Sequence, residues 1–359
     1  LGKQSGYMGT LGAWGAGKTF DGTLTTPDPV GVHSLLSTMA HAGVTHLAME
    51  ASSHGLHQFR VDGVRIDIAG FTNLSRDHLD YHGSMSAYLA AKMRLFADVM
   101  VDGGMAVLNA DTPEFPALDA ACRLRKLRVL SFGENGDTIR LLGVVREAAA
   151  QRLKLNVFGQ VYDVTLPLAG RFQAANAMCA LGFVLASGAD PKEAVAALET
   201  LKGVPGRLQF VGAHKNGAPV YVDYAHTPDA LETVLNALRP HTTGKLVVVF
   251  GCGGDRDKGK RRLMGEQAKE LADRVIVTDD NPRTEEAAAI RREVLQGAVG
   301  AEEIGDRDLA IKTAIAGLNA GDVLLIAGKG HENGQIVGST VIPFSDADVA
   351  QRHLHEVRA

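Results

Sequence analysis

Several features that mark other classes of protein are scarce or absent in this sequence. Its three cysteines, Cys122, Cys179 and Cys252, are too few and too widely spaced for a disulfide framework or a metal knuckle, which indicates a reducing compartment. No apolar run approaches the roughly 18–20 residues that span a bilayer. The formal net charge is only −4, and neither sign gathers in a stripe or tail. We therefore expect a cytoplasmic protein whose partners include no nucleic acid and no membrane.

Aromatic residues are also few, whereas glycine is abundant. The 1 Trp, 6 Tyr and 12 Phe make up 5% of the chain, which argues against stacking platforms for single-stranded nucleic acid. Glycine occurs 41 times without a collagen-like period, so the surplus is expected in turns and in close backbone approaches of the kind that bind phosphate. The 359 residues are well above the roughly 150 of a typical domain and predict two domains.

Apolar runs alternate with helical patterns between residues 44 and 132, which is typical of a parallel sheet with crossover helices. The predicted strands are Thr45–Met49, Ile66–Phe71, Met105–Leu108 and Val129–Phe132, and the predicted helices are Met85–Val99 and Pro116–Arg123. The stretch 139–168 changes to short alternating segments without a helical period. It predicts a small antiparallel insertion.

A second alternation follows after the turn at residues 203–206. Before it, the sequence predicts two helices, Gln173–Ala186 and Pro191–Leu201, the second capped by Asp190 with Pro191 in its first turn. Beyond the turn, buried strands are predicted at Val220–Val222, Leu246–Phe250, Val275–Val277 and Val323–Ile326. The fold class is therefore α/β, with a second, doubly wound unit and a domain boundary near residue 208.

Chemically active side chains are concentrated directly after the predicted strands. In an open parallel sheet, ligands collect at the carboxyl ends of the strands. Seven such segments carry carboxylates, histidines, lysines or glycines: 50–54, 72–78, 109–111, 223–226, 251–258, 279–283 and 328–332. Solvated loops alone do not explain a set of this kind, so both parts of the chain are expected to contribute functional edges.

Residues 12–19, Gly-Ala-Trp-Gly-Ala-Gly-Lys-Thr, match the G-x4-G-K-T pattern of a phosphate-binding loop letter for letter. That loop also needs a buried strand before it and a helix after it, whose N-terminus faces the phosphates. The preceding segment 3–10 is too short and polar for a central strand, and two prolines and a glycine occupy residues 20–29. We predict a glycine-rich turn here, and Lys18 is not assigned to phosphate.

The segment Gly251–Arg256 follows a predicted strand and nearly matches the dinucleotide fingerprint G-x-G-x-x-G. Arg256 stands where the third glycine is required, so the fingerprint fails and a nicotinamide-dependent enzyme is disfavoured. The charged run 255–261 better suits an anionic substrate held by paired charges.

Two further groups of residues raise the question of a metal. His54 and His57 have no partner at the spacing of zinc ligands. Glu50 and His78, expected at the ends of adjacent strands, could hold a hard cation such as Mg²⁺ together with waters and phosphate oxygens. Taken one at a time, each of these residues could equally serve the fold alone.

Six long motifs stand out together. They are residues 49–55 (Met-Glu-Ala-Ser-Ser-His-Gly), 72–83 (Thr-Asn-Leu-Ser-Arg-Asp-His-Leu-Asp-Tyr-His-Gly), 222–230 (Val-Asp-Tyr-Ala-His-Thr-Pro-Asp-Ala), 251–261, 280–283 (Asp-Asn-Pro-Arg) and 328–332 (Gly-Lys-Gly-His-Glu). As a set they resemble the Mur ligase family, from the first residues to about Asp346. The resemblance implies an ATP- and Mg²⁺-dependent amide ligase of peptidoglycan synthesis. Its expected small-molecule substrates are UDP-MurNAc-L-Ala-D-Glu and meso-diaminopimelate, joined through an acyl phosphate, and the expected state is a monomer.

The resemblance also implies roles for individual residues. It assigns catalysis and magnesium binding to Glu50, His78 and Lys92, the lysine being carbamylated. It assigns ATP binding to Asn176, Arg207 and Asp223, while Gln173 departs from the asparagine usual in the family. It assigns the muramoyl dipeptide to Thr25, Thr26, Ser52, Gln58 and Arg60. It assigns diaminopimelate to Arg256, Asp280, Asn281, Pro282, Arg283, Gly328 and Glu332.

The charges of three of these residues agree with the implied substrates. Arg60 suits a substrate that carries carboxylates and a diphosphate. The guanidinium of Arg283 can hold the distal carboxylate that diaminopimelate has and lysine lacks. Glu332 can pair with the distal ammonium.

The family's phosphate loop, a Gly-Thr-Asn-Gly-Lys-Thr type of run, and a uridine-binding domain are expected before residue 1. The resemblance thus implies a natural protein of three domains, of which this chain carries a truncated central ATP- and magnesium-binding domain (1–208) and a Rossmann-like amino-acid-binding domain (209–359). Three alternatives stay open at this point: the same ligase using L-lysine, an enzyme like folylpolyglutamate synthase, and a non-catalytic nucleotide-binding module.

Overall fold

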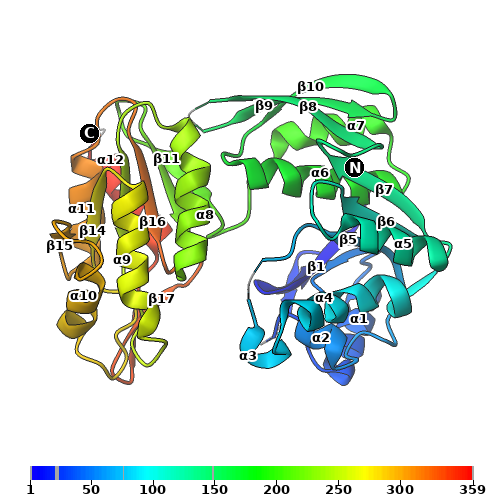
Figure 1. The fold of residues 1–359 in the computed structure, drawn as a ribbon, viewed down its shortest axis with the longest axis horizontal. Helices are drawn as coiled ribbons and strands as arrows, with labels where there is room; N and C mark the ends of the chain where they lie inside the picture. The colour runs from blue at the N-terminus through cyan, green and yellow to red at the C-terminus, as the bar shows by residue number, and fades with distance from the viewer. Residues whose placement is uncertain (1, 21–23, 76, 148, 358–359) are drawn as a thin grey trace. The chain divides into compact units, whose positions relative to one another are not determined.

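The computed structural model describes residues 2–20, 24–75, 77–147 and 149–357, and the chain divides into two compact units (Figure 1). Unit 1 comprises Leu1–Gly143, Lys154–Val164 and Ala175–Leu198; unit 2 comprises Val144–Leu153, Thr165–Ala174 and Glu199–Ala359. A functional domain boundary at residue 208 stays a prediction. No helix within the described ranges is both long and apolar enough to cross a membrane.

The first sheet of unit 1 has four strands in the order β3-β2-β1-β4. They are β1 (Ser5–Gly9), β2 (Gly12–Gly15), β3 (Lys18–Phe20) and β4 (His46–Met49). Strand β1 is parallel to β4 and antiparallel to β2, which pairs with β3 in turn. Helix α1 (Pro29–His41), capped by Asp28, packs Val32 and Met39 into one core with Met8 and Ala13 of the sheet.

The phosphate-loop pattern at residues 12–19 forms the β2–β3 hairpin, with Ala16 and Gly17 in its turn at φ of 51° and 73°. A strand rather than a helix follows the glycines, so the predicted glycine-rich turn is confirmed. The expectation that segment 3–10 holds no central strand is wrong, because β1 lies between β2 and β4. Its buried face comes from Gly6 and Met8, and glycine contributes almost nothing to a hydropathy pattern.

The second sheet has six strands in the order β10-β9-β8-β7-β6-β5. Strands β5 (Ile66–Phe71), β6 (Met100–Asn109) and β7 (Arg128–Gly133) are parallel, as predicted. Strand β4 is absent from this sheet, so the expectation that Glu50 and His78 follow adjacent strands is wrong. Strands β8 (Ile139–Arg146), β9 (Gln151–Val157) and β10 (Gln160–Leu166) extend the sheet, and two residues join β9 to β10, which permits only antiparallel pairing. The antiparallel segment is thus confirmed as a continuation of the sheet.

Helices follow in the four places where the periodicity predicts them: α4 (Met85–Arg94) continued by a π-helical segment (Leu95–Val99), α5 (Phe115–Leu124), α6 (Arg171–Ala186) and α7 (Pro191–Ala197) continued by a 3₁₀ segment (Leu198–Thr200). The short helices α2 (Ser53–His57) and α3 (Leu79–His82) were not predicted. Asp190 caps α7 by accepting from the amides of Lys192 and Glu193 at 3.0 and 3.1 Å, so the predicted cap is confirmed.

Unit 2 contains a second six-stranded sheet, in the order β11-β12-β16-β13-β14-β15. Its strands are β11 (Gln209–Ala213), β12 (Pro219–Asp223), β13 (Leu246–Phe250), β14 (Arg274–Val277), β15 (Glu302–Glu303) and β16 (Val323–Ala327). All neighbours pair in parallel except β11 with β12. The four predicted strands of this unit are therefore confirmed.

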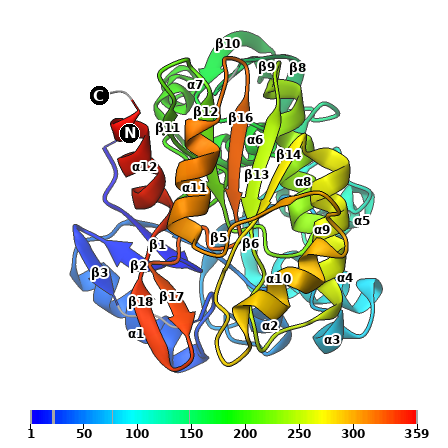
Figure 2. The ribbon, with the colours of Figure 1, turned by 90° about the vertical axis from the view of Figure 1, so that its left-hand side faces the viewer.

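Helices cover both faces of this sheet (Figure 2). They are α8 (Pro228–Leu238), α9 (Gly259–Leu271), α10 (Ala287–Leu295), α11 (Arg307–Ala316) and α12 (Asp346–Glu356). A 3₁₀ segment (Arg239–His241) follows α8. Strands β17 (Gly334–Val337) and β18 (Thr340–Pro343) form a separate hairpin. Successive side chains of a strand point to opposite faces. Val248 and Phe250 accordingly join the core that includes α8 and α9, whereas Val247 and Val249 join the core that includes α11 and α12. This is the doubly wound arrangement predicted from the sequence.

Candidate active site

The loops after β14 and β16 meet at the carboxyl edge of the unit 2 sheet. Asn281 donates from Nδ2 to Glu332 Oε2 at 2.9 Å, which joins the two loops directly. Gly328 has φ of 116°, and a Cβ built there would lie 2.7 Å from Asp280 Oδ2. Glycine is therefore required at 328 for the Asp280 carboxylate to lie against this backbone.

Lys329 connects the same two loops from within the protein. Its side chain is fully buried, and Nζ donates to Asn281 Oδ1 and Glu332 Oε2, both at 3.0 Å, and to the carbonyl of Gly334 at 2.6 Å. Sequence reasoning did not assign Lys329 to the site. The available signal was its place inside the 328–332 motif, directly after a buried strand.

The β17 strand holds the loop that carries residues 280–283. The amide of Arg283 donates to the carbonyl of Ile336 at 3.0 Å, and the amide of Gly338 donates back to the carbonyl of Arg283 at 2.7 Å. Gln335 Nε2 reaches the carbonyl of Asp280 at 2.7 Å, and the amide of Ile336 reaches Asn281 Oδ1 at 2.9 Å. The hairpin thus fixes the backbone of the predicted diaminopimelate residues.

The two arginines predicted for diaminopimelate are placed differently. Arg283, at φ of 50°, directs Nη1 to the carbonyl of Gly254 at 2.8 Å, which ties the loop after β14 to the loop after β13. The one hydrogen bond that the described residues give the Arg256 side chain goes to the carbonyl of its neighbour Asp255, at 3.0 Å. The structure therefore gathers Asp280, Asn281, Arg283 and Glu332 with Gly328, and leaves the Arg256 guanidinium outside that network.

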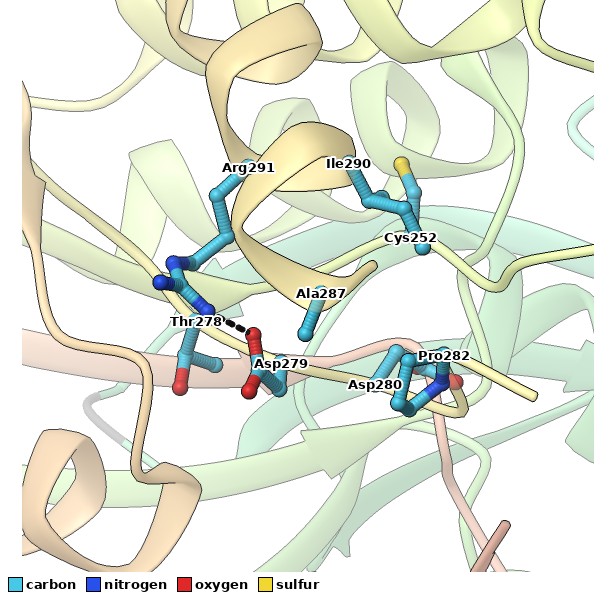
Figure 3. A pocket seen from close by; sticks show the side chains of 8 residues that line it. All are labelled: Cys252, Thr278, Asp279, Asp280, Pro282, Ala287, Ile290 and Arg291. Carbon is cyan, nitrogen blue, oxygen red and sulfur yellow. Dashed lines mark hydrogen bonds and ion pairs between the residues drawn. The ribbon is translucent and has the colours of Figure 1, made fainter. Parts of the chain in front are cut away.

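Asp280 and Pro282 also line a small hollow beside α10 (Figure 3), together with Cys252, Thr278, Asp279, Ala287, Ile290 and Arg291. An ion pair from Arg291 to Asp279 lies at one side of it, as Figure 3 shows. Burial raises the pKa of the Cys252 thiol to about 12, so this thiol stays protonated near neutral pH. Burial also raises the pKa of Asp280, although the nearby positive charges of Arg307 and Lys329 act to lower it.

Two of the predicted ATP-binding residues lie close together in unit 2. The Asp223 carboxylate accepts from the amides of Leu208 and Ala225 at 2.6 and 2.7 Å, and burial raises its pKa. The guanidinium of Arg207 lies over the ring of Tyr224, 5.0 Å from its centre. Gln173 Nε2 donates to the carbonyl of Arg207 at 3.1 Å, so the residue that departs from the family pattern still supports this turn. Asn176 is exposed on α6 and belongs to unit 1.

In unit 1, Glu50 is the centre of a hydrogen-bonded group that includes the predicted dipeptide residues. Its carboxylate accepts from the hydroxyl groups of Tyr7 and Thr10, the latter at 2.7 Å. Thr10 Oγ1 lies 3.0 Å from Thr25 Oγ1, and Thr26 Oγ1 donates to the carbonyl of Glu50 at 2.9 Å. The carboxylate is therefore held by neutral hydroxyl groups.

The remaining dipeptide residues continue this group. The amide of Ser52 donates to Thr26 Oγ1 at 3.0 Å, while Ser52 Oγ caps α2 through the amide of Gly55. Arg60 donates from Nη1 to the carbonyl of Thr26 at 2.8 Å and from Nε to Gln58 Oε1 at 3.1 Å. All five predicted dipeptide residues thus belong to one connected set.

Four histidines that are scattered in the sequence come together beside Tyr81 and Tyr88. We call His54, His57, His78 and His82 the histidine cluster. The rings of His54 and His78 meet edge to face with 4.9 Å between their centres, and the rings of His82 and Tyr88 stack with 5.1 Å between their centres. Burial, aided by neighbouring histidines, lowers the pKa values of His54 and His82. The sequence did not predict this assembly.

Lys92 lies at the edge of the histidine cluster. Its Nζ is 4.9 Å from the centre of the Tyr88 ring. That ring lies perpendicular to the His78 ring, with 6.0 Å between the two ring centres. Burial lowers the pKa of Lys92, opposed by Asp77. Two of the three residues predicted for catalysis therefore flank one tyrosine, whereas no hydrogen bond or ion pair among the described residues joins Glu50 to either of them.

A magnesium ion held by the predicted ligands would take most of its coordination shell from water and phosphate. Within residues 2–20, 24–75, 77–147 and 149–357, no three His, Cys, Asp or Glu side chains are placed to hold a metal by themselves. Glu50 offers a hard carboxylate and His78 a half-exposed imidazole. Mg²⁺ commonly takes one or two protein ligands and completes its shell with waters and substrate phosphates.

Comparison with known proteins covers nearly the whole chain. Residues 1–184 match the Mur ligase middle domain, and residues 206–330 match the glutamate ligase domain of Mur ligases. The UDP-N-acetylmuramoyl-L-alanyl-D-glutamate–2,6-diaminopimelate ligase of Bradyrhizobium diazoefficiens is 54% identical over 351 residues, covering 96% of this chain and 72% of that protein. The ligase of the same name from Agrobacterium fabrum is 52% identical over 356 residues, covering 99% and 73%.

A solved structure described as this same ligase superposes with a TM-score of 0.74 at 36% identity, covering 99% of this chain and 74% of that one. The sheet orders, the strand-end loops and these matches agree with the family that the six motifs suggested. The chain belongs to the Mur ligase family.

Proposed function

We propose that this chain supplies the catalytic and amino-acid-binding parts of an ATP-dependent ligase that joins meso-diaminopimelate to the D-Glu carboxylate of UDP-MurNAc-L-Ala-D-Glu. The observation that carries the proposal is the group formed by Asp280, Asn281, Arg283 and Glu332 against Gly328. It places a guanidinium and a carboxylate at one sheet edge, and the distal end of diaminopimelate carries the opposite pair of charges. The relatives that share more than half of the residues bear the name of this activity.

The chemistry proceeds in two steps. The D-Glu carboxylate attacks the γ-phosphate of ATP, which forms an acyl phosphate and releases ADP. The amine of diaminopimelate then attacks the acyl carbon, and the carbon–oxygen bond to phosphate breaks as the amide forms. The first step converts a poor acyl donor into a good one. It brings two anions together, the D-Glu carboxylate and the γ-phosphate, so the site must supply positive charge.

Residues of unit 1 are assigned to the acceptor substrate and its activation. Thr25, Thr26, Ser52, Gln58 and Arg60 bind the muramoyl dipeptide, for which Arg60 supplies a cation to the substrate's anionic groups. Glu50 and His78 would hold magnesium, which neutralises charge on the phosphates when bound. Lys92, carbamylated by CO₂, would act as a further carboxylate beside it.

The remaining assignments concern ATP and the organisation of the protein. Asn176, Arg207 and Asp223 bind the nucleotide, and Arg256, Pro282 and Gly328 complete the diaminopimelate site. We infer a functional division at residue 208 between an ATP- and magnesium-binding part and an amino-acid-binding part. We also infer that the protein works as a cytoplasmic monomer.

The test is the release of ADP by the full-length protein. We expect release to require ATP, Mg²⁺, UDP-MurNAc-L-Ala-D-Glu and meso-diaminopimelate together, with a tripeptide product of the corresponding mass. Turnover of L-lysine in place of diaminopimelate would support the lysine-specific ligase, and turnover of a folate with glutamate would support a folylpolyglutamate synthase. Nucleotide binding without turnover of any amino acid would leave the non-catalytic module as the correct assignment.

A further inference from the structure

We propose that Lys329 is a positioning residue that helps the protein to select its amino-acid substrate. It holds the Glu332 side chain so that one carboxylate oxygen stays free for the distal ammonium of the substrate. The proposal rests on the proposed function, in which Glu332 pairs with that ammonium. It adds a residue that makes no contact with substrate and acts through Glu332 and Asn281.

The first observation is that all three protons of the Lys329 ammonium are used. An ammonium has three donors and no acceptor. Here the three acceptors are Asn281 Oδ1 at 3.0 Å, Glu332 Oε2 at 3.0 Å and the carbonyl of Gly334 at 2.6 Å. The side chain is fully buried, so its charge lies behind the loops rather than in the solvent that a substrate crosses.

The second observation is that the contacts close into a triangle. Asn281 Nδ2 also donates to Glu332 Oε2, at 2.9 Å, so Oε2 receives two hydrogen bonds from behind. Lys329 fixes the orientation of the Asn281 amide as well, because Oδ1 accepts from both Nζ and the amide of Ile336. Each of the three side chains is therefore held by the other two.

The third observation concerns the other oxygen of the same carboxylate. Among the described residues, no side chain or amide donates to Glu332 Oε1, and a third of the Glu332 side chain is exposed. A free glutamate loses rotamer entropy when it is fixed. Lys329 and Asn281 impose that order before any substrate arrives, so a substrate ammonium meets an acceptor that already points in one direction.

The experiment compares two substrates that differ only in the distal ammonium: meso-diaminopimelate and 2-aminopimelate, which keeps the distal carboxylate. The kcat/KM for each is measured by ADP release in the full-length protein and in the variants Lys329→Met, Glu332→Gln and Lys329→Met/Glu332→Gln. The matched control is Lys312→Met, which removes an exposed lysine from α11 in the same unit.

For Lys329→Met, we expect the preference for diaminopimelate over 2-aminopimelate to fall about 10-fold, the effect of losing one charge-assisted hydrogen bond. The KM values for ATP and for the muramoyl dipeptide should stay within about 2-fold of those of Lys312→Met. Adding Lys329→Met to Glu332→Gln should not lower the preference further, because the two residues act as one unit.

An unchanged preference in Lys329→Met overturns the proposal, and so does a parallel loss for both amino acids together with raised KM values for ATP and dipeptide. If Lys329→Met alone fails to fold, the double variant is compared with Glu332→Gln instead, since Glu332→Gln removes the carboxylate charge that the loss of the lysine leaves unpaired. The proposal is also overturned if the double variant prefers diaminopimelate over 2-aminopimelate less than Glu332→Gln does. A wild-type protein that turns over neither amino acid would instead refute the proposed function.

Discussion

Arg283 is the residue on which the choice of amino acid is expected to depend. A guanidinium can hold a carboxylate through two parallel hydrogen bonds, an arrangement that neither lysine nor asparagine reproduces. Its backbone is held by Ile336 and Gly338 and its Nη1 by Gly254, so the fork is oriented by contacts that do not depend on substrate. Under the proposed function, the distal carboxylate is recognised by Arg283 and the distal ammonium separately by Glu332.

We predict that Arg283→Asn lowers kcat/KM for meso-diaminopimelate about 100-fold, mainly by raising its KM, because a charge-assisted pair is lost. The KM for ATP should be unchanged. Steady-state kinetics with Arg262→Asn as the control, an exposed arginine that pairs with Glu266 on α9, would check this. Equal kinetics in the two variants would remove Arg283 from the specificity site.

The Lys92 amine, for which we propose a reaction with CO₂, is partly desolvated. Burial lowers the pKa of Lys92, and the neutral amine is the form that adds to CO₂. As pH rises through that lowered pKa, the reactive fraction increases at a lower pH than for an exposed lysine. We predict that ¹³C-bicarbonate gives a carbamate signal near neutral pH in the wild type that Lys92→Ala removes, with at least about a 100-fold loss of kcat in that variant. A carbamate signal of equal intensity in Lys92→Ala would contradict the assignment.

At the scale of elements, a buried ion pair ties helix α12 to the loops after β14 and β16. The Arg307 side chain, fully buried, donates to both carboxylate oxygens of Asp346 at 2.7 Å. It also donates to the carbonyls of Asp279, at 3.2 Å, and Ala327, at 2.9 Å, which directly precede the loops at 280–283 and 328–332. Asp346 begins α12, so the last helix supports the loops through one guanidinium.

We predict that Asp346→Asn destabilises the protein by about 3–5 kcal/mol, because it leaves the Arg307 charge buried without a counter-ion. Glu266→Gln, which breaks an exposed pair on α9, should cost less than about 0.5 kcal/mol. Urea unfolding followed by the fluorescence and circular dichroism of each variant measures both values. A loss below about 1 kcal/mol in Asp346→Asn would show that the pair does not support the fold.

The burial and composition of the individual elements explain which of them the sequence could predict. Leu246–Phe250 has the bounds of β13, because a strand buried on both faces needs a continuous apolar run. Ile66–Phe71 has the bounds of β5 as well, although its run is interrupted by the exposed Asp67. Strand β1 was missed because half of its buried face is glycine, and β18 because it is exposed along its whole length. The strand-end rule located the 280–283 and 328–332 loops, but burial of Lys329 depends on long-range contacts that no local pattern encodes.

At the scale of the molecule, the division into units depends on contacts between segments that are far apart in the sequence. Residues 144–153 and 165–174 belong to unit 2 although the strands β8–β10 continue a sheet of unit 1. His241, at the end of the helical segment after α8, accounts for part of this: Nε2 accepts from the amide of Gly170 at 3.1 Å, and Nδ1 contacts the carbonyl of Glu147. One imidazole thereby holds both outlying segments.

This arrangement requires a neutral imidazole, with the proton on Nδ1, since protonation of Nε2 removes the acceptor for Gly170. Burial lowers the pKa of His241 below its ordinary value, although the contact with Glu147 opposes the shift. At pH values between the lowered pKa of the folded state and the unfolded pKa of about 6.5, the unfolded state binds more protons than the folded state. The contribution of His241 to the free energy of unfolding is therefore fully present above about pH 6.5 and falls as the pH falls below it. We predict that His241→Gln flattens this part of the plot of unfolding free energy against pH, whereas His355→Gln, an exposed histidine of α12, leaves the slope unchanged. Urea titrations from pH 5 to pH 8 measure the slope, and equal slopes in the wild type and His241→Gln would show that other groups cause the acid sensitivity.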